Sequence, residues 1–290
     1  IDVKGYGSIG LITYMRTDST RISDEALQDV RNYIVNKYGD EYVPEKPRIF
    51  KNKSSSQDAH EAIRPTNILL TPEDVKDSLN RDQLKLYKLI WERFVACQMA
   101  PAVFDTLNVD ISVEEYIFKV SGSRIKFPGY HVVYKEAKDE TEEGNNNEDY
   151  DEEENANLPE LLEGEKLKLK NIDSKQNFTQ PPPRYTEASL VKALEEKGIG
   201  RPSTYAPIIS TIITRNYVVR ESKLLYPTEL GKIVTDILKN HFQDIVDVSF
   251  TAKVEAELDK IEEGDKDWIE VLNDFYKGFV VPVLRAFHAC

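Results

Sequence analysis

Residues 181–227, PPPRYTEASLVKALEEKGIGRPSTYAPIISTIITRNYVVRESKLLYP, predict two short helices, a tight turn between them and a β-hairpin after them. The prolines form a stiff connector, Thr186 can cap the first helix, and Gly198 ends it. Either Ser203 or Thr204 can cap the second helix. This order of elements is that of a winged-helix unit.

The turn between the two predicted helices carries the sequence GIGRPST, residues 198–204. A helix N-terminus directs N–H groups and a partial positive charge at an anion. Arg201 adds a full charge, and Ser203 and Thr204 add hydroxyl donors, which suits the phosphate backbone of single-stranded DNA. Arg215, at the far end of the second helix, extends this track. A capped turn that serves packing alone is the alternative.

Upstream, residues 101–178 are expected to be mostly β-structure, because apolar and polar residues alternate in 105–113, 116–125 and 167–173. Residues 136–157 interrupt this region with eleven acidic residues and one lysine. A stretch of this composition is predicted to be a disordered, solvated loop. It accounts for ten of the thirteen net negative charges, so the total of −13 does not exclude a polyanionic partner.

Residues 1–100 are predicted to be mainly helical. Ser23 and Gly39 delimit one helix, Thr71 caps the start of another, and apolar residues recur with helical spacing over 81–99. After the hairpin near the C-terminus, residues 229–240 and 250–287 show the same periodicity.

The fold class is therefore multidomain α+β, with a mainly helical region at 1–100, a β-rich region at 101–178 and a helical, winged-helix-like region at 179–290. No apolar run reaches about 18 residues, so no membrane span is expected. Two cysteines are too few for a disulfide framework or a cysteine-based zinc site.

Residues 10–23, GLITYMRTDSTRIS, bring Tyr14 to the end of an apolar run. A phenol has an ordinary pKa of about 10 and is a poor nucleophile at neutral pH unless a cation assists it. Arg16, two residues on, points to the same side of an extended segment, and its guanidinium suits a phosphate oxygen. The pair can attack a phosphodiester and form a phosphotyrosyl link. A core tyrosine beside a surface arginine is the alternative.

Two further features bear on phosphate chemistry. His60, in DAHEAIRPT, can hydrogen-bond a phosphate, with Arg64 adding charge; a plain loop histidine is the alternative. Asp149, Asp151 and Glu153 match the spacing of some magnesium sites. They lie in the acidic run rather than after an apolar strand, so no metal site is predicted there.

Five blocks occur in a fixed order and together resemble the bacterial type IA DNA topoisomerases. They are GLITYMRTDSTRIS, DAHEAIRPT, FVACQMAPA, the PPPRYTEASLVKALEEKGIGRPSTYAPIISTI block and SFTAKVEAELDKIEEG. The methionine after the tyrosine and the GIGRPSTYA sequence favour the topoisomerase I (omega protein) group over topoisomerase III and reverse gyrase. The resemblance covers nearly the whole chain, with the acidic loop as the main departure.

The resemblance implies roles for particular residues. Tyr14 matches the nucleophile that holds the 5′ phosphate of a cut strand, Arg16 the arginine that positions the scissile phosphate, and His60 a histidine that hydrogen-bonds it. Asp18 lies in the tyrosine motif and is expected to orient its neighbours. The residues matching the single-strand groove are Arg201, Ser203, Thr204 and Arg215.

The resemblance also implies an architecture and a reaction. Residues 1–100 match the tyrosine-bearing lobe of a torus, 101–178 part of its arch, and 179–290 part of its DNA-binding base. The family relaxes negatively supercoiled DNA without ATP, using Mg²⁺ held by a Toprim domain that lies N-terminal to these blocks. The chain is thus expected to be a central piece of a bacterial cytoplasmic, nucleoid-associated monomer. By itself it is expected to be inactive and to hold no cofactor.

Two interpretations from other classes remain. The first is a winged-helix DNA-binding protein without chemistry, which leaves the tyrosine motif and His60 unexplained. The second is a partner-binding protein whose acidic loop recruits a basic protein. A covalent adduct with single-stranded DNA would exclude the first, and unchanged relaxation after deletion of 138–156 would confine the loop to an accessory role.

Overall fold

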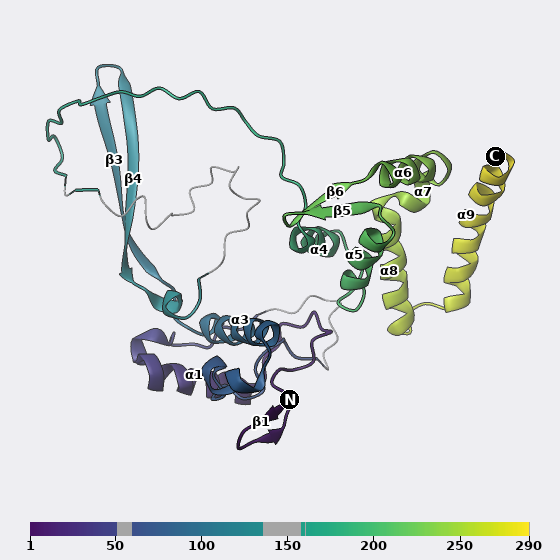
Figure 1. Ribbon diagram of the computed structural model, residues 1–290, viewed down its shortest axis with the longest axis horizontal. Coiled ribbons are helices and arrows are strands. Elements are labelled where there is room, and N and C mark those ends of the chain that lie inside the picture. Colours follow the sequence, from purple (N-terminus) through teal and green to yellow (C-terminus); the bar gives the residue numbers. More distant parts are fainter. Residues whose placement is uncertain (51–59, 136–157, 160, 290) are drawn as a thin grey trace. The chain divides into compact units, whose positions relative to one another are not determined.

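The structure is a computed structural model that describes residues 1–50, 60–135, 158–159 and 161–289 (Figure 1). The chain divides into two compact units, one within residues 1–181 and the other formed mainly by residues 182–290. The division into three regions at residues 100 and 178 stays a prediction. The acidic loop at 136–157 lies outside the described residues.

The first unit contains the helices predicted for it. They are α1 (Asp24–Tyr38), α2 (Pro72–Val75) and α3 (Arg81–Cys97), with short 3₁₀ turns at Asp40–Tyr42 and Lys76–Ser78. The Ser23 hydroxyl accepts the Ala26 N–H at the start of α1, and Thr71 forms a capping box with Asp74 at the start of α2. Local capping signals therefore fixed these helix starts.

The core of this unit lies between α1 and α3. Val30 and Ile34 of α1 are fully buried, and Tyr33 packs edge-on against Trp91 of α3. The Trp91 indole N–H donates to the Ile68 carbonyl at 3.1 Å. A buried donor needs a hydrogen-bond partner, and here the partner is the backbone of the segment between residue 60 and α2. This bond attaches that segment to α3.

Tyr87 of α3 makes a second contact of this kind. Its hydroxyl donates to the Leu70 carbonyl at 2.6 Å, and burial raises the pKa of Tyr87 to about 12. Leu70 is itself buried. The bonds to the Ile68 and Leu70 carbonyls attach residues 68–70 to α3. Residues 60–66, which include His60, lead directly into this attached stretch.

A long antiparallel hairpin follows α3. Strands β3 (Val103–Val113) and β4 (Tyr116–Phe127) pair over their whole length, with Val109 opposite Val120 (Figure 1). The strands predicted at 105–113 and 116–125 are confirmed. A minor pair, β1 (Asp2–Val3) and β2 (Gly7–Ser8), opens the chain.

The prediction of a strand at 167–173 is wrong, because these residues form no strand in the structure. Leu169 and Ile172 are mostly exposed, so no neighbouring surface covers their side chains. Alternation of apolar and polar residues indicates a strand only where a partner edge completes the hydrogen bonds. Residues 101–178 are therefore less β-rich than predicted.

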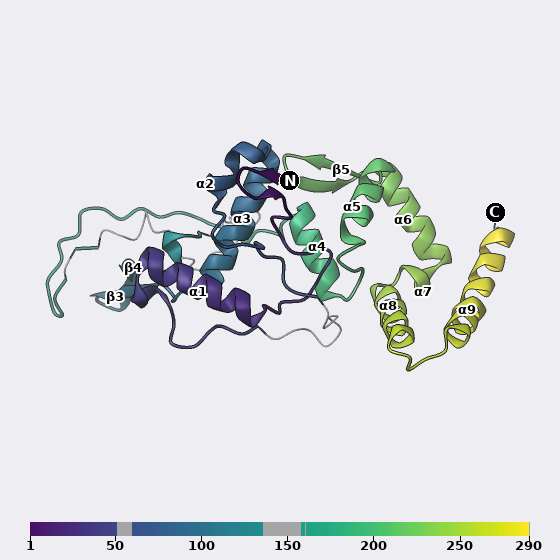
Figure 2. The same ribbon diagram turned by 90° about the horizontal axis from the view of Figure 1, so that it is seen from below.

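The second unit has the predicted order of helix, helix, hairpin and helices (Figure 2). Its elements are α4 (Glu187–Glu196), α5 (Tyr205–Thr214), β5 (Val218–Glu221), β6 (Leu224–Pro227), α6 (Glu229–His241), α7 (Gln243–Val246), α8 (Val248–Glu262) and α9 (Trp268–Ala289). The segment before α4 joins the hairpin, since the Leu225 N–H donates to the Tyr185 carbonyl at 2.8 Å. Among the described helices, none combines the length and apolarity that crossing a membrane requires.

Two helical glycines of this unit should respond oppositely to alanine. At Gly231 in α6 an added Cβ would lie 2.1 Å from the Tyr217 carbonyl oxygen, whereas at Gly278 in α9 it would meet nothing within 4 Å. We expect Gly231→Ala to lower the free energy of unfolding by about 1–3 kcal/mol through overpacking. Gly278→Ala should raise the free energy of unfolding by about 0.5–1 kcal/mol, because alanine has less conformational entropy to lose on folding than glycine. Urea unfolding of both variants measures the difference; equal shifts would contradict the close approach at Gly231.

Candidate active site

The segment before Tyr14 is paired with residues 62–66. Ile12 and Pro65 form an antiparallel bridge, and backbone hydrogen bonds of 3.0 Å flank it on both sides. We call residues 10–13 and 62–66 the paired segments. They fix the chain on the N-terminal side of Tyr14 to the chain on the C-terminal side of His60.

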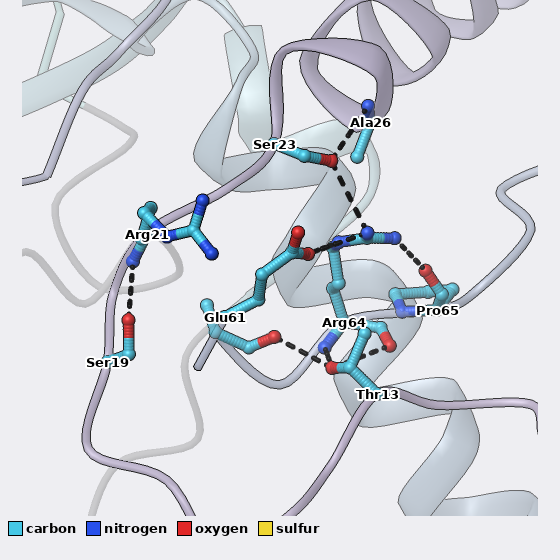
Figure 3. A network of polar contacts seen from close by, with 9 residues as sticks. Thr13, Ser19, Arg21, Ser23, Ala26, Glu61, Arg64 and Pro65 are labelled. Carbon is cyan, nitrogen blue, oxygen red and sulfur yellow. Dashed lines mark hydrogen bonds and ion pairs between the residues drawn. The ribbon is translucent and has the colours of Figure 1, made fainter. Parts of the chain in front are cut away.

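The Thr13 side chain adds a second link between the paired segments (Figure 3). Its hydroxyl donates to the Ala62 carbonyl at 2.7 Å and accepts the Arg64 N–H at 2.9 Å. One hydroxyl can do both, because it carries a donor and two acceptor lone pairs. Thr13 directly precedes Tyr14, so these bonds restrain the backbone from which the phenol projects.

The Arg64 side chain makes hydrogen bonds and an ion pair within the first unit (Figure 3). Its guanidinium contacts Glu61 at 2.7 and 2.9 Å, donates to the Pro65 carbonyl at 3.0 Å, and reaches the Ser23 hydroxyl at 3.5 Å. Only 14% of the Arg64 side chain is exposed. These contacts do not support the interpretation that Arg64 offers charge to a phosphate; they tie the paired segments to the start of α1.

Tyr14 and His60 lie together. Their ring centroids are 5.2 Å apart with a tilt of 48° between the planes, and the Tyr14 side chain is 54% exposed. Arg16 is exposed and Asp18 is half-buried on the same loop. The structure therefore joins two of the three predicted catalytic side chains and leaves the phenol accessible to a substrate.

The residues around Tyr14 do not fit a magnesium site. Among the described residues no group of three or more His, Cys, Asp and Glu side chains is placed to hold a metal ion. Glu61, the carboxylate next to His60, is paired with Arg64. Asp149, Asp151 and Glu153 lie outside the described residues.

The other predicted site residues belong to the second unit. In the GIGRPST turn, residues 198–204, Gly198 and Gly200 have φ of 69° and 79°, which favours glycine. Thr204 occupies the N-cap position of α5, but its hydroxyl accepts the Arg201 N–H at 2.8 Å and makes no bond to the helix. The prediction that Ser203 or Thr204 caps the second helix is therefore confirmed for the N-cap position of Thr204 and wrong for a side-chain bond, because the Thr204 hydroxyl closes the turn instead.

Arg201 is held by two acidic residues of α8. Its guanidinium contacts Asp259 at 2.7 Å and Glu255 at 3.5 Å, and also donates to the Gly200 carbonyl at 2.8 Å. The hydrogen bond that Arg201 donates to the Asp259 carboxylate raises the pKa of Arg201 above its ordinary value. Ser203 and Arg215 are exposed, at the two ends of α5. The guanidinium N–H groups of Arg201, which were predicted to bind phosphate, point to carboxylates instead.

Sequence reasoning missed four residues that organise these sites: Thr13, Glu61, Glu255 and Asp259. Glu61 and Arg64 are three residues apart, but the segment is not helical, so the i,i+3 rule for helices gave no signal for their ion pair. No sequence signal links Arg201 to α8, because Glu255 is 54 residues from Arg201 in the chain and Asp259 is 58 residues away.

Residues 5–273 match the family model described as DNA topoisomerase. This match covers most of the chain, which belongs to the DNA topoisomerase family. The resemblance inferred from the sequence blocks is confirmed.

Among solved structures, the chain is similar to full-length topoisomerase I from Thermotoga maritima. The two share 40% sequence identity and superpose with a TM-score of 0.80. The similarity covers 96% of this chain and 43% of the Thermotoga chain. The chain therefore spans less than half the length of the protein it matches.

Proposed function

We propose that this chain carries the tyrosine-bearing part of a type IA DNA topoisomerase that relaxes negatively supercoiled DNA. The observation that carries the proposal is the accessible Tyr14 phenol, 54% exposed, with the His60 ring 5.2 Å away on the neighbouring segment. This exposure leaves the phenol within reach of a substrate, and the ring contact places an imidazole beside it. Membership of the DNA topoisomerase family supports the same reaction class.

In the proposed first step, the Tyr14 phenol oxygen attacks a phosphorus of one DNA strand. The new bond joins the phenol oxygen to the 5′ phosphate, the bond to the 3′ oxygen breaks, the phenol loses its proton, and the leaving 3′ oxygen gains one. After strand passage the freed 3′ hydroxyl attacks the phosphotyrosine and restores the strand. The covalent link conserves the phosphodiester bond energy, so no ATP is required.

The neighbouring residues have supporting roles in this proposal. Arg16 positions the scissile phosphate and stabilises its developing charge, which a planar guanidinium does well. His60 hydrogen-bonds the phosphate beside the phenol. Asp18 orients the loop between them. The exposure of Arg16 and the ring contact of His60 with Tyr14 support these assignments.

The second unit is proposed to hold single-stranded DNA. Ser203, Thr204 and Arg215 are exposed on α5 and its N-terminal turn, as contacts to a phosphate backbone require. Arg201 belongs to the same proposed groove, although it is engaged with α8. The proposed assembly is a bacterial, cytoplasmic and nucleoid-associated monomer in which residues 1–100, 101–178 and 179–290 form lobe, arch and base.

Membership of the family is consistent with a Mg²⁺ requirement. We propose that a Toprim domain, which the resemblance of the sequence blocks implies, supplies the ligands; among the described residues, no group of His, Cys, Asp and Glu side chains is placed to hold the ion. When bound, the ion would supply electrostatic stabilisation of the phosphate and its leaving oxygen. The 290-residue chain alone is accordingly expected not to relax DNA in a Mg²⁺ assay.

Strand polarity gives a direct test of the proposal. The full-length protein is mixed with a single-stranded oligonucleotide, quenched with denaturant and resolved by size. Label on the 3′ end should stay with the protein and label on the 5′ end should be released, because the 5′ phosphate is the one retained. Mass spectrometry of the digest should locate the adduct on the Tyr14 peptide. No adduct, or one with the opposite polarity, would refute the proposal.

A further inference from the structure

The carboxylates of α8 stand where a phosphate would have to bind Arg201. Asp259 takes the guanidinium at 2.7 Å and Glu255 lies 3.5 Å from its other nitrogen. Glu255 also accepts the Gly200 backbone N–H at 3.2 Å. The turn could offer an anion two groups, the Arg201 guanidinium and the Gly200 N–H. Both are already bound by the carboxylates of Asp259 and Glu255.

The charges of this group oppose an added anion. Arg201, Glu255 and Asp259 together carry a net charge of −1 at neutral pH, since one guanidinium faces two carboxylates. A phosphate brought to the group would meet net repulsion unless it displaced a carboxylate. All three side chains are partly exposed, at 33%, 23% and 33%, so displacement needs no opening of a core.

We propose that Asp259 and Glu255 act as an internal competitor for Arg201, so that single-stranded DNA must displace them to bind the GIGRPST turn. This inference rests on the proposed function and adds a control of affinity to it. The competitor weakens DNA binding at this turn and favours release of the strand, which a cyclic strand-passing enzyme needs. Asp259 and Glu255 are thus affinity-setting residues that do not contact the reacting atoms.

Equilibrium binding of a short fluorescent single-stranded oligonucleotide tests this inference. Every protein is the full-length chain with Tyr14→Phe, so that cleavage cannot contribute. Asp259→Asn keeps the size of the side chain and removes its charge. We expect it to tighten binding about threefold to tenfold, in keeping with a partly exposed ion pair and one removed repulsion. The slope of log K against log salt should steepen by up to about 0.7, because no displaced Asp259 carboxylate then takes up a cation to offset the one that Arg201 releases from the strand.

Two further variants isolate the Arg201 contact. Glu263 is the exposed C-cap residue of α8, and Glu263→Gln makes the same charge change as Asp259→Asn. It should leave the affinity within about twofold of the parent. In an Arg201→Gln background, Asp259→Asn should lose its effect, since the competed group is gone. Glu255→Gln, which keeps an oxygen for the Gly200 N–H, should tighten binding in the same direction, and it replaces Asp259→Asn if that variant unfolds early.

Unchanged or weaker binding by Asp259→Asn, with Arg201→Gln clearly weakened, would mean that α8 only positions Arg201 and would overturn the competition. Unchanged binding in both variants would remove Arg201 from the DNA contact and would overturn it as well. Neither outcome touches the proposed Tyr14 chemistry, which is judged separately by the covalent adduct.

Discussion

Tyr14→Phe is expected to reduce covalent DNA adduct formation and relaxation by the full-length protein at least about a thousandfold, the scale on which loss of a nucleophile acts. Only the phenol oxygen is removed, so the ring contact with His60 at 5.2 Å can persist. The thermal midpoint should therefore stay within about 1 °C of the parent, because the side chain is largely exposed. Quantified adduct in denaturing gels and a plasmid relaxation assay provide the measurements.

Tyr6 offers a matched control for this experiment. Its side chain is 54% exposed, the same fraction as Tyr14, and it lies in the same unit. Tyr6→Phe removes an equivalent hydroxyl and should leave adduct and relaxation unchanged. Adduct that survives Tyr14→Phe, or that falls equally with Tyr6→Phe, would assign the nucleophile elsewhere.

Thr13→Val is expected to lower the rate of adduct formation by about tenfold to a hundredfold. Valine has nearly the same shape but breaks the bonds to the Ala62 carbonyl and the Arg64 N–H. The paired segments would then hold Tyr14 and His60 less precisely, and small displacements of a nucleophile have effects of this size. The lost hydrogen bonds should also lower the free energy of unfolding by about 1–3 kcal/mol.

Two controls separate positioning from a general loss of stability. Thr13→Ser keeps the hydroxyl and should restore most of the adduct rate. Thr66→Val breaks the 2.6 Å bond to the Gly10 carbonyl at the far end of the paired segments, away from Tyr14, and should affect the rate little. If Thr13→Val matched the parent in single-turnover rate, or if Thr66→Val were equally slow, the positioning role of Thr13 would be wrong.

Local signals predicted most of the secondary structure. Ser23 and Thr71 cap helices at the predicted places, and the alternation at 105–113 and 116–125 forms a hairpin. These signals act within a few residues of the backbone they determine, so the chain order alone reveals them. The candidate site was predicted to the extent that Tyr14 and His60 were both selected and lie together.

Predictions failed where the folded chain decides which partner a group meets. Residues 167–173 alternate like a strand but form none, since no described edge pairs with them. Arg64 appeared to be a cation for DNA, yet Glu61 and Ser23 use its donors. The Thr204 hydroxyl accepts the Arg201 N–H and makes no bond to the first turn of α5. For Arg64 and Thr204, the side chain has several partners of similar strength, and packing selects among them.

The sequence by itself determined the family, the capped helices and the identity of the tyrosine motif, because motifs and caps depend on residues close together in the chain. The tertiary structure alone decided that Thr13 joins the paired segments beside Tyr14, and that Glu255 and Asp259 hold Arg201. Hydrogen bonds and ion pairs act over only a few ångströms. The fold of the chain decides which residues come within that reach when they are 49 to 58 positions apart in the sequence.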